Sequence, residues 1–387
     1  MEIHGHCDPA FERVKNAFSE NFRERREVGA SVAVSINEIM VVDLWAGVAS
    51  QATQSPWSRS TIVNVYSASK GLAALCAHRL VDQGKLVLDA PIARYWPEFA
   101  QAGKSELPVH LVLSHRAGLP AIKQPLPSDA LYDWETMTSA LAAQAPWWPP
   151  GSKHGYHALT FGYLVGELVR RISGKSVGTY LREELAVPLG LDCFIGFDGA
   201  EDFRVADIIP PPPMPAEQQA NLATIFKDPE SVAAKAISNP SMIVKIWSAK
   251  VANSRRWRFA EIPAGNAHTN ARAFATLYGA LACGGTCGGI DVLSGESIGR
   301  CYTEQSNGPD AVNLTPTRFS MGFGLSLPDQ KMGPNPRAFG HSGAGGSIGF
   351  ADPDASVGFG YTMNQMLPGN LIDVRAATLL EALYGCL

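Results

Sequence analysis

The sequence is organised around one stretch, Asn64-Val65-Tyr66-Ser67-Ala68-Ser69-Lys70-Gly71. Apolar residues follow it at helical spacing, which predicts entry into a helix with one buried face. These apolar residues are Leu72, Leu75, Cys76 and Leu80. Three positions separate Ser67 from Lys70, so one helical turn places both side chains on the same face. A serine hydroxyl is a weak nucleophile until a base takes its proton, and a lysine with a depressed pKa can do so. The amides at the helix start also point towards any anion that forms there.

A Ser-x-x-Lys tetrad alone is also compatible with a helix-capping serine followed by a surface lysine. A lysine in the first turn of a helix is poorly placed against the helix dipole, so its presence there requires a reason. The neighbouring residues Ala68, Gly71, Ala73 and Ala74 are small and leave room for a substrate. This context favours a reactive serine.

The composition indicates a globular enzyme-sized chain. The 387 residues are 46% hydrophobic and 18% charged, enough for one large domain or two packed subdomains. A net charge of -4 without a basic run argues against nucleic-acid binding. Seven scattered cysteines indicate free thiols rather than a disulfide framework, and their spacing predicts no metal site. Because neither a secretory signal nor a membrane-spanning run is recognisable, we expect a cytoplasmic protein without membrane association.

The order of periodic segments predicts an α/β fold of the α+β type. A helix starts at Asp8-Pro9, and residues 30–36 and 39–45 form a β-hairpin. The C-terminal strand candidates span residues 319–327, 338–341, 346–352 and 357–364, followed by a closing helix over 371–383. We therefore expect one antiparallel sheet built from both chain ends and flanked by the terminal helices, with a helical subdomain inserted. The expected boundaries are 1–65 and 310–387 for the sheet, and 66–309 for the helical part, with an irregular insertion at 209–260.

Two further clusters are candidates for chemistry. Tyr156 lies in a glycine-rich loop before a helix, where positive neighbours such as Lys70 could stabilise a phenolate. The alternative is an ordinary loop aromatic. The second cluster, residues 339–346, is a run of small residues around His341 that would let a backbone amide approach a ligand closely. Its alternative is a β-bulge or tight sheet edge.

In this order, the three motifs resemble the serine β-lactamase and penicillin-binding-protein superfamily. The resemblance is strongest to its esterase branch, the family VIII carboxylesterases, which are similar to class C β-lactamases. It implies a β-lactamase-like fold, Ser67 as nucleophile, and Lys70 with Tyr156 as a coupled base system. It also implies an oxyanion hole formed by the N–H groups of Ser67 and Ala344. The expected substrate-binding residues are His341, Ser342, Gly343, Trp148 and His157, and the expected partner is a small ester, with no cofactor and no metal.

Two departures from the superfamily pattern favour neutral esters over penicillin-type substrates. Ala158 stands where related enzymes usually carry an asparagine whose amide holds an acylamide side chain. His341 stands where they carry a lysine, and a histidine is mostly neutral at pH 7. The chain therefore lacks a permanent cation for a substrate carboxylate at this motif.

Competing interpretations remain open. Gly345-Gly346-Ser347-Ile348-Gly349 fits the nucleophile elbow of α/β-hydrolases, but a strand rather than a helix is expected to follow it. His115, His154 or His157 could serve a serine as base, although none has an evident acidic partner. The same machinery could support β-lactamase, amidase, peptidase or acyltransferase activity. A catalytically silent acyl- or penicillin-binding module is the alternative from another class.

Overall fold

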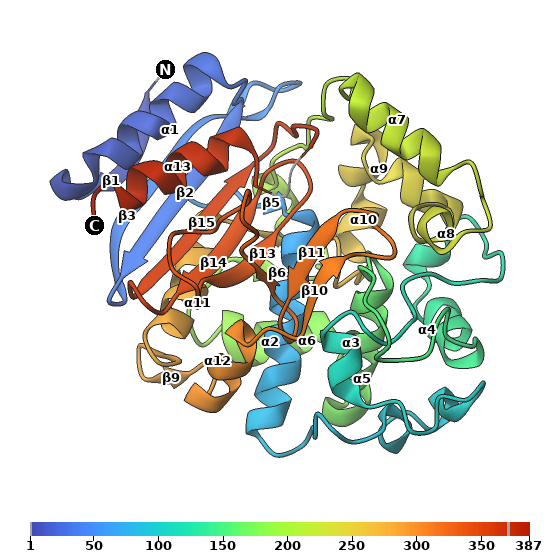
Figure 1. Cartoon of the computed structure of the whole chain (residues 1–387). Helices are drawn as coiled ribbons and strands as arrows, with labels where there is room; N and C mark the ends of the chain where they lie inside the picture. The colour runs from blue at the N-terminus through green and yellow to red at the C-terminus, as the bar shows by residue number, and fades with distance from the viewer. Residues whose placement is uncertain (1, 370–371) are drawn as a thin grey trace.

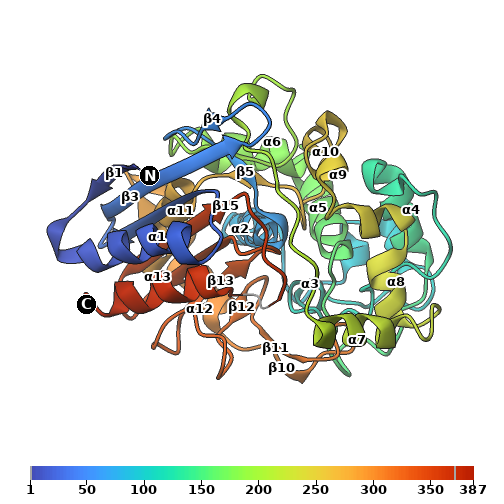
Figure 2. The same cartoon turned by 90° about the horizontal axis from the view of Figure 1, so that it is seen from above.

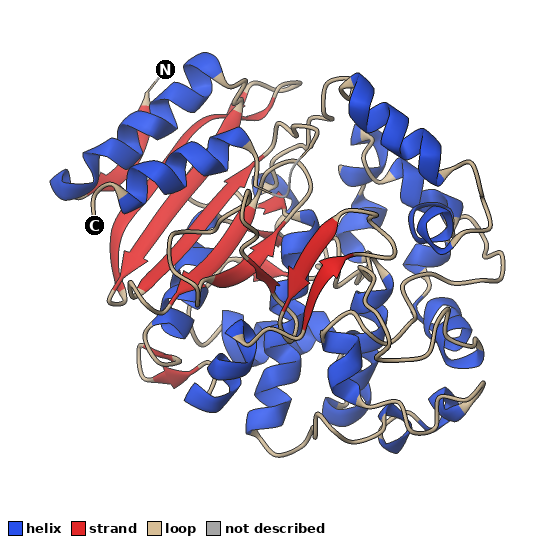
Figure 3. Cartoon of the chain, in the orientation of Figure 1, coloured by secondary structure: helices blue, strands red, loops and turns tan. Residues whose placement is uncertain are grey.

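The computed structural model describes residues 2–369 and 372–387, and within them ten strands form one antiparallel sheet. The strand order is β1-β3-β2-β15-β14-β13-β12-β11-β10, with β4 added beside β3. The strands are β1 Ile3–Cys7, β2 Gly29–Ile36, β3 Ile39–Ser50, β4 Ser55–Pro56, β10 Ser306–Pro309, β11 Pro316–Phe319, β12 Gly324–Leu325, β13 Phe339–Ser342, β14 Ile348–Asp352 and β15 Val357–Met363. The N-terminal hairpin joins the C-terminal strands where β2 pairs with β15. This confirms the predicted antiparallel sheet from both chain ends (Figures 1 and 3).

The two terminal helices cover one face of this sheet. α1 (Glu12–Glu24) and α13 (Val374–Tyr384) lie side by side on it, as Figures 1 and 2 show. Val32 and Val34 point from β2 into the core shared with both helices, whereas Ala33 between them contacts the helix on the opposite face. This alternation is the two-residue period of a strand. The hairpin itself was predicted from the valine and isoleucine content of its two segments and from the Asn37-Glu38 turn between them.

Helix α11 (Ala271–Ala282) packs on the opposite face at unusually short range. A Cβ atom at Gly358 would lie 2.2 Å from the backbone nitrogen of Gly279, and one at Gly360 would lie 2.1 Å from the carbonyl oxygen of Ala271. Only glycine at these strand positions lets the helix backbone rest directly on β15. Since α11 lies within 66–309, part of the range assigned to the helical subdomain covers the sheet.

Helix α2 (Ser69–Asp82) runs between the sheet and the remaining helices (Figure 2). The helix is buried on all sides over most of its length, whereas the sequence predicted only one buried face. The alanines and glycine that punctuate it allow close packing on all sides. The surrounding helices are α3 Val109–Leu113, α4 Trp134–Ala143, α5 Thr160–Ser173, α6 Val177–Leu181, α7 Ala216–Ile225, α8 Val232–Ser238, α9 Ala249–Ala252, α10 Arg255–Phe259 and α12 Gly295–Tyr302. Short strands complete the fold: β5 Val63–Asn64, β6 Cys193–Phe194, β7 His268–Thr269, β8 Thr286–Cys287 and β9 Ile290–Asp291.

Several element predictions need correction. The strand expected over 319–327 is a hairpin of β11 and β12, because the backbone turns at Gly322 with a φ of 92°. The segment 209–260 is not irregular throughout, since it holds α7 to α10. The closing helix begins at Val374, and the expected start at Leu371 lies outside the described residues. Among the described residues, no helix combines the length and the apolar character needed to cross a bilayer.

Candidate active site

Ser67 and Lys70 meet at the start of helix α2. Ser67 lies in a short 3-10 helix, Tyr66–Ala68, that leads directly into α2. Its Oγ lies 3.1 Å from Lys70 Nζ, which also donates a hydrogen bond of 2.9 Å to the carbonyl oxygen of Ala264. Tyr66, just before the serine, has a φ of 44°, a left-handed conformation that bulky residues seldom adopt outside functional sites. Local helix geometry therefore brings the hydroxyl and the amine together.

The Lys70 side chain is fully buried, with 0% of its surface exposed. It forms no ion pair with any carboxylate among the described residues. Burial without a compensating anion disfavours the ammonium form, and it lowers the pKa of Lys70 well below the ordinary value. The amine is thus suited to accept a proton from the serine hydroxyl.

Tyr156 closes the site from the other side. Lys70 Nζ lies 4.7 Å from the centre of the Tyr156 ring, and Phe319 stacks on that ring at 5.7 Å with planes only 9° apart. The Tyr156 hydroxyl is buried and makes no hydrogen bond of normal geometry within the described chain. Burial raises the pKa of Tyr156, and its interaction with Ser67 opposes this only in part. The phenol is therefore protonated at neutral pH.

Asp310, which sequence reasoning missed, holds the Tyr156 loop in place. Both of its carboxylate oxygens accept from the Tyr156 N–H, at 2.9 and 3.1 Å. The same carboxylate accepts from the Val312 and Asn313 N–H groups and from the Thr317 hydroxyl, each at 2.8 Å. Asp310 is only 2% exposed, so these charge-assisted bonds form in a dry environment. A lone aspartate 154 positions away from the tyrosine gives no local sequence signal of this role.

The end of strand β13 approaches the helix start closely enough to place two amides together. A Cβ atom at Gly343 would lie 1.9 Å from the carbonyl oxygen of Val65 and 3.3 Å from the Ala68 nitrogen. Ser67, Gly343 and Ala344 line one cleft. Within the described parts of the chain, neither the Ser67 N–H nor the Ala344 N–H donates a hydrogen bond. Both amides are therefore available for an anion that develops beside Ser67.

Arg375, from helix α13, braces the loop that carries Ala344. Its guanidinium is fully buried and donates to the carbonyl oxygens of Gly345, at 2.7 Å, and Gln365, at 2.9 Å. It also pairs with Glu27 at 3.1 Å and with Asp373 at 2.6 Å. The C-terminal helix thus contributes to the site through a side chain that the sequence did not single out.

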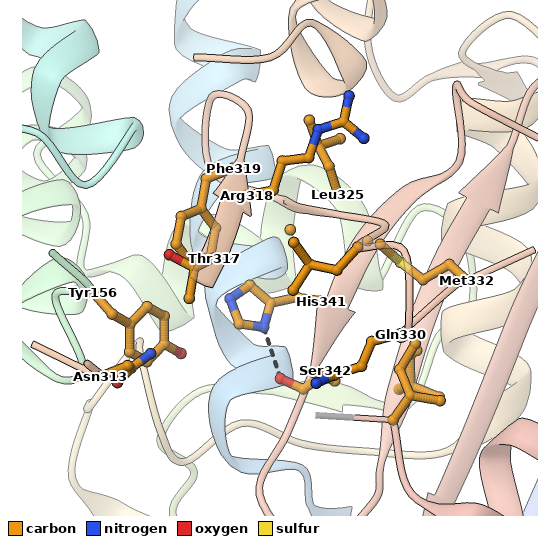
Figure 4. A pocket seen from close by; sticks show the side chains of 15 residues that line it. Tyr156, Asn313, Thr317, Arg318, Phe319, Leu325, Gln330, Met332, His341 and Ser342 are labelled. Carbon is orange, nitrogen blue, oxygen red and sulfur yellow. Dashed lines mark hydrogen bonds between the residues drawn. The ribbon is translucent and has the colours of Figure 1, made fainter. Parts of the chain in front are cut away.

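His341 lies in β13 beside Tyr156 (Figure 4). Its Nδ1 donates a hydrogen bond of 2.7 Å to the carbonyl oxygen of Ser342. Burial, assisted by the positive charge that Lys70 can carry, lowers the pKa of His341 to about 3. The ring is therefore neutral at pH 7, in line with the expectation that this position supplies no permanent cation.

Two expected substrate contacts are instead structural. His157 is fully buried; its Nδ1 donates to the Gly155 carbonyl at 2.7 Å, and its Nε2 accepts from the Leu119 N–H at 3.2 Å. With both nitrogens occupied, it has no free polar atom to offer a ligand. Trp148 packs under the loop against Gly155, in a small cluster with Val312, and its Nε1 donates to the Lys153 carbonyl. Its aromatic ring therefore supports the loop that carries Tyr156.

The competing serine and histidines do not assemble a second centre. Ser347 is fully buried, and the strand β14 follows it directly, so the strand-to-helix turn of a nucleophile elbow is missing at this described position. His115 is buried, and its Nδ1 accepts from the His157 N–H at 3.1 Å. His154 shares a 3.0 Å hydrogen bond with the Thr317 hydroxyl. No described group of three or more His, Cys, Asp or Glu residues is arranged to hold a metal ion.

A cleft of about 870 Å³ opens above Ser67. Ser67, Tyr156 and Ala344 lie in its wall, together with Trp247 from the segment 209–260. Trp247 stacks on Tyr66 with ring centres 5.3 Å apart and planes at 30°. A smaller cavity lies next to the cleft, behind Tyr156 and His341 (Figure 4).

Comparison with known proteins agrees with this geometry. The sequence matches the family described as Beta-lactamase over residues 14–383. It is 38% identical over 369 residues to the esterase/beta-lactamase LipL of Mycobacterium tuberculosis (strain ATCC 25618 / H37Rv), covering 94% of this chain and 83% of that protein. Among solved structures, a family VIII carboxylesterase superposes with a TM-score of 0.89 at 41% identity, and both chains are covered completely. A penicillin-binding protein homologue from Caulobacter crescentus does so with a TM-score of 0.89 at 39% identity and the same coverage.

Proposed function

This chain belongs to the beta-lactamase family, and from that premise we propose that it is a carboxylesterase acting on short-chain esters through an acyl-enzyme on Ser67. The observation that carries the proposal is the 3.1 Å approach of a buried, unpaired Lys70 amine to the Ser67 hydroxyl. The similarity to a family VIII carboxylesterase over the whole chain supports the choice of esters.

In the first step, Ser67 Oγ attacks the ester carbonyl while Lys70 takes the hydroxyl proton. The lowered pKa of Lys70 keeps the amine neutral and ready for this role. The carbonyl oxygen becomes an oxyanion, which the N–H groups of Ser67 and Ala344 can stabilise because the close approach at Gly343 brings them to one cleft.

Collapse of the tetrahedral intermediate breaks the bond between the carbonyl carbon and the alcohol oxygen. The leaving alkoxide needs a proton, and the Tyr156 phenol, kept protonated by burial, is placed to supply it and to be replenished from Lys70. Water then attacks the acyl-enzyme, the same groups act in reverse, and the free acid leaves. Lys70 and Tyr156 thus work as one coupled system, with the amine as base and the phenol as acid during acylation.

We test the assignment with p-nitrophenyl butyrate and two serine variants. Ser67→Ala should reduce kcat by about a thousandfold or more, the range seen when a hydrolase nucleophile is removed. The matched control is Ser347→Ala, because the Ser347 hydroxyl is buried without a described hydrogen-bond partner and lies outside the residues that line the cleft. Full activity in Ser67→Ala, or loss only in Ser347→Ala, would refute the assignment.

A covalent probe separates the esterase from a catalytically silent acyl-binding module. An alkyl p-nitrophenyl phosphonate should add one adduct to the wild type by intact-mass measurement, and peptide mapping should place it on Ser67. The adduct should be missing from Ser67→Ala and present in Ser347→Ala. A wild type that binds the probe without covalent addition would support the binding module instead.

A small-molecule ester is accordingly the proposed partner of this site, and the cytoplasm stays the proposed location. All seven cysteines are free thiols, which fits a reducing compartment.

A further inference from the structure

A small cavity of about 50 Å³ lies behind Tyr156 (Figure 4). Its walls are mostly apolar and include Leu325 and Met332. Tyr156 and Gln330 line both this cavity and the catalytic cleft, so the two spaces are adjacent. The volume accommodates a chain of roughly two or three non-hydrogen atoms. The cavity can therefore hold a short substituent of a substrate whose reacting carbonyl lies at Ser67.

Two residues that line this cavity carry a buried acceptor without a hydrogen-bond partner, and the Tyr156 hydroxyl, which the proposed mechanism uses as the acid, is likewise unpaired within the described residues. The Ser342 carbonyl can only accept, so the proton of the neutral His341 ring is on Nδ1 and Nε2 carries a lone pair. Nε2 is buried and has no hydrogen-bond partner in residues 2–369 and 372–387. Figure 4 shows this nitrogen turned away from Ser342, on the side of Tyr156. The Oε1 atom of Gln330 is also buried and unpaired within the same residues.

The cavity lining also contains a charged side chain. Arg318 lines the cavity, but its Nε donates to Glu304 and its Nη1 to the Ser326 carbonyl. The pKa of His341, lowered to about 3, keeps the imidazole an acceptor throughout the neutral range. A buried acceptor without a partner costs free energy, and a hydroxyl group on the ligand removes that cost. The cavity therefore matches a short chain that ends in a hydrogen-bond donor.

The position of Tyr156 indicates which half of the ester enters. In the proposed mechanism the phenol protonates the departing alcohol oxygen, so the alcohol must lie on the Tyr156 side of the carbonyl. We propose that the cavity binds the alcohol half of the substrate and selects alcohols with a second hydroxyl group, that is, monoesters of small diols and polyols. This inference rests on the proposed esterase function and names the substrate class of the same site.

The test compares two esters with the same number of non-hydrogen atoms, 2-hydroxyethyl butyrate and n-propyl butyrate. Release of butyric acid is followed by pH-stat titration at pH 7. In the wild type, kcat/KM should be about three- to tenfold higher for the hydroxyethyl ester, the value of one net hydrogen bond. In His341→Phe the ratio should fall to about one, and in His341→Gln, which restores a side-chain acceptor, it should lie above one. A hydroxyl placed on the acyl half, tested with ethyl 3-hydroxybutyrate against ethyl pentanoate, should bring no such preference.

A wild-type ratio near one overturns the inference, as does a preference that survives intact in His341→Phe. Because the wild-type ratio is decisive by itself, the inference stays testable even if a variant fails to fold. The two proposals fail differently. Serine-dependent hydrolysis of both esters at equal rates refutes only the substrate class, whereas no hydrolysis of either ester, or of p-nitrophenyl butyrate, refutes the esterase itself.

Discussion

Replacing Gly343 by alanine should separate the two amides of the proposed oxyanion hole. The added Cβ would lie 1.9 Å from the Val65 carbonyl oxygen, and contacts of this kind essentially never fall below 3.0 Å. The end of β13 must therefore move away from the helix start by at least about 1.1 Å (3.0 − 1.9). Because the neighbour is backbone at the core of the site, no flexible side chain can absorb the shift.

A displacement of about 1 Å is enough to remove one oxyanion donor from its productive position. Loss of such a donor raises the activation free energy by about 2.7–4 kcal/mol, so kcat should fall by about a hundred- to a thousandfold. The overpacking itself should lower the free energy of unfolding by about 1–3 kcal/mol. The oxyanion effect acts on the transition state, so KM should change much less than kcat.

The assay is kcat and KM with p-nitrophenyl butyrate at 25 °C, accompanied by thermal unfolding to confirm that the variant is folded. The matched control is Gly299→Ala in helix α12, where the nearest atom to the new Cβ is the Tyr302 hydroxyl at 3.8 Å. Alanine at that helix position should leave kcat unchanged and stabilise the fold slightly. A folded Gly343→Ala enzyme with wild-type kcat would refute the placement of the oxyanion hole.

The same geometry supports three other predictions. Activity should rise as the pH passes the lowered pKa of Lys70 and should be lost at lower pH, because only the neutral amine accepts a proton. Lys70→Met should lower kcat by at least about a hundredfold. A pH profile that this substitution leaves unaltered would contradict the role of the amine. Arg375→Met should lower the free energy of unfolding by about 3–5 kcal/mol, since Glu27 and Asp373 are left buried without their cation; a thermal midpoint equal to that of the wild type would argue against it. Nitrocefin should be a much poorer substrate than a neutral ester. His341→Lys should raise the ratio of kcat/KM for nitrocefin to kcat/KM for the ester about ten- to a hundredfold, because the lysine adds a positive charge for the nitrocefin carboxylate. A wild type that hydrolyses nitrocefin as fast as its best ester would show this reasoning to be wrong.

The helices in the segment 209–260 could not be predicted from hydrophobic periodicity. The proline-rich residues 209–215 favoured an irregular structure for the whole segment. The helices α7 to α10 that follow are short, and the apolar residues on their faces give only weak periodic patterns. Trp247 reaches the cleft from this segment by stacking on Tyr66, 181 positions earlier in the chain. No local sequence pattern around either residue predicts this contact.

The sequence by itself determined the features that depend on near neighbours. The valine- and isoleucine-rich segments 30–36 and 39–45, joined by Asn37-Glu38, predicted the hairpin of β2 and β3. Helix geometry also placed Ser67 and Lys70 on one face, since residues three apart in a helical turn must stack.

Only the tertiary structure decided the chemistry of those side chains. The pKa of Lys70 depends on burial by distant elements, and a tetrad seen in sequence carries no measure of desolvation. Asp310 contacts Tyr156, which lies 154 positions earlier in the chain, and Arg375 contacts Gly345, which lies 30 positions earlier. His157 lies next to Tyr156 in sequence, yet its ring is taken up by backbone groups, one of them from another loop. Local spacing determines which side chains share a face. Burial and hydrogen-bond partners depend on residues from the whole chain, so only the tertiary structure determines them.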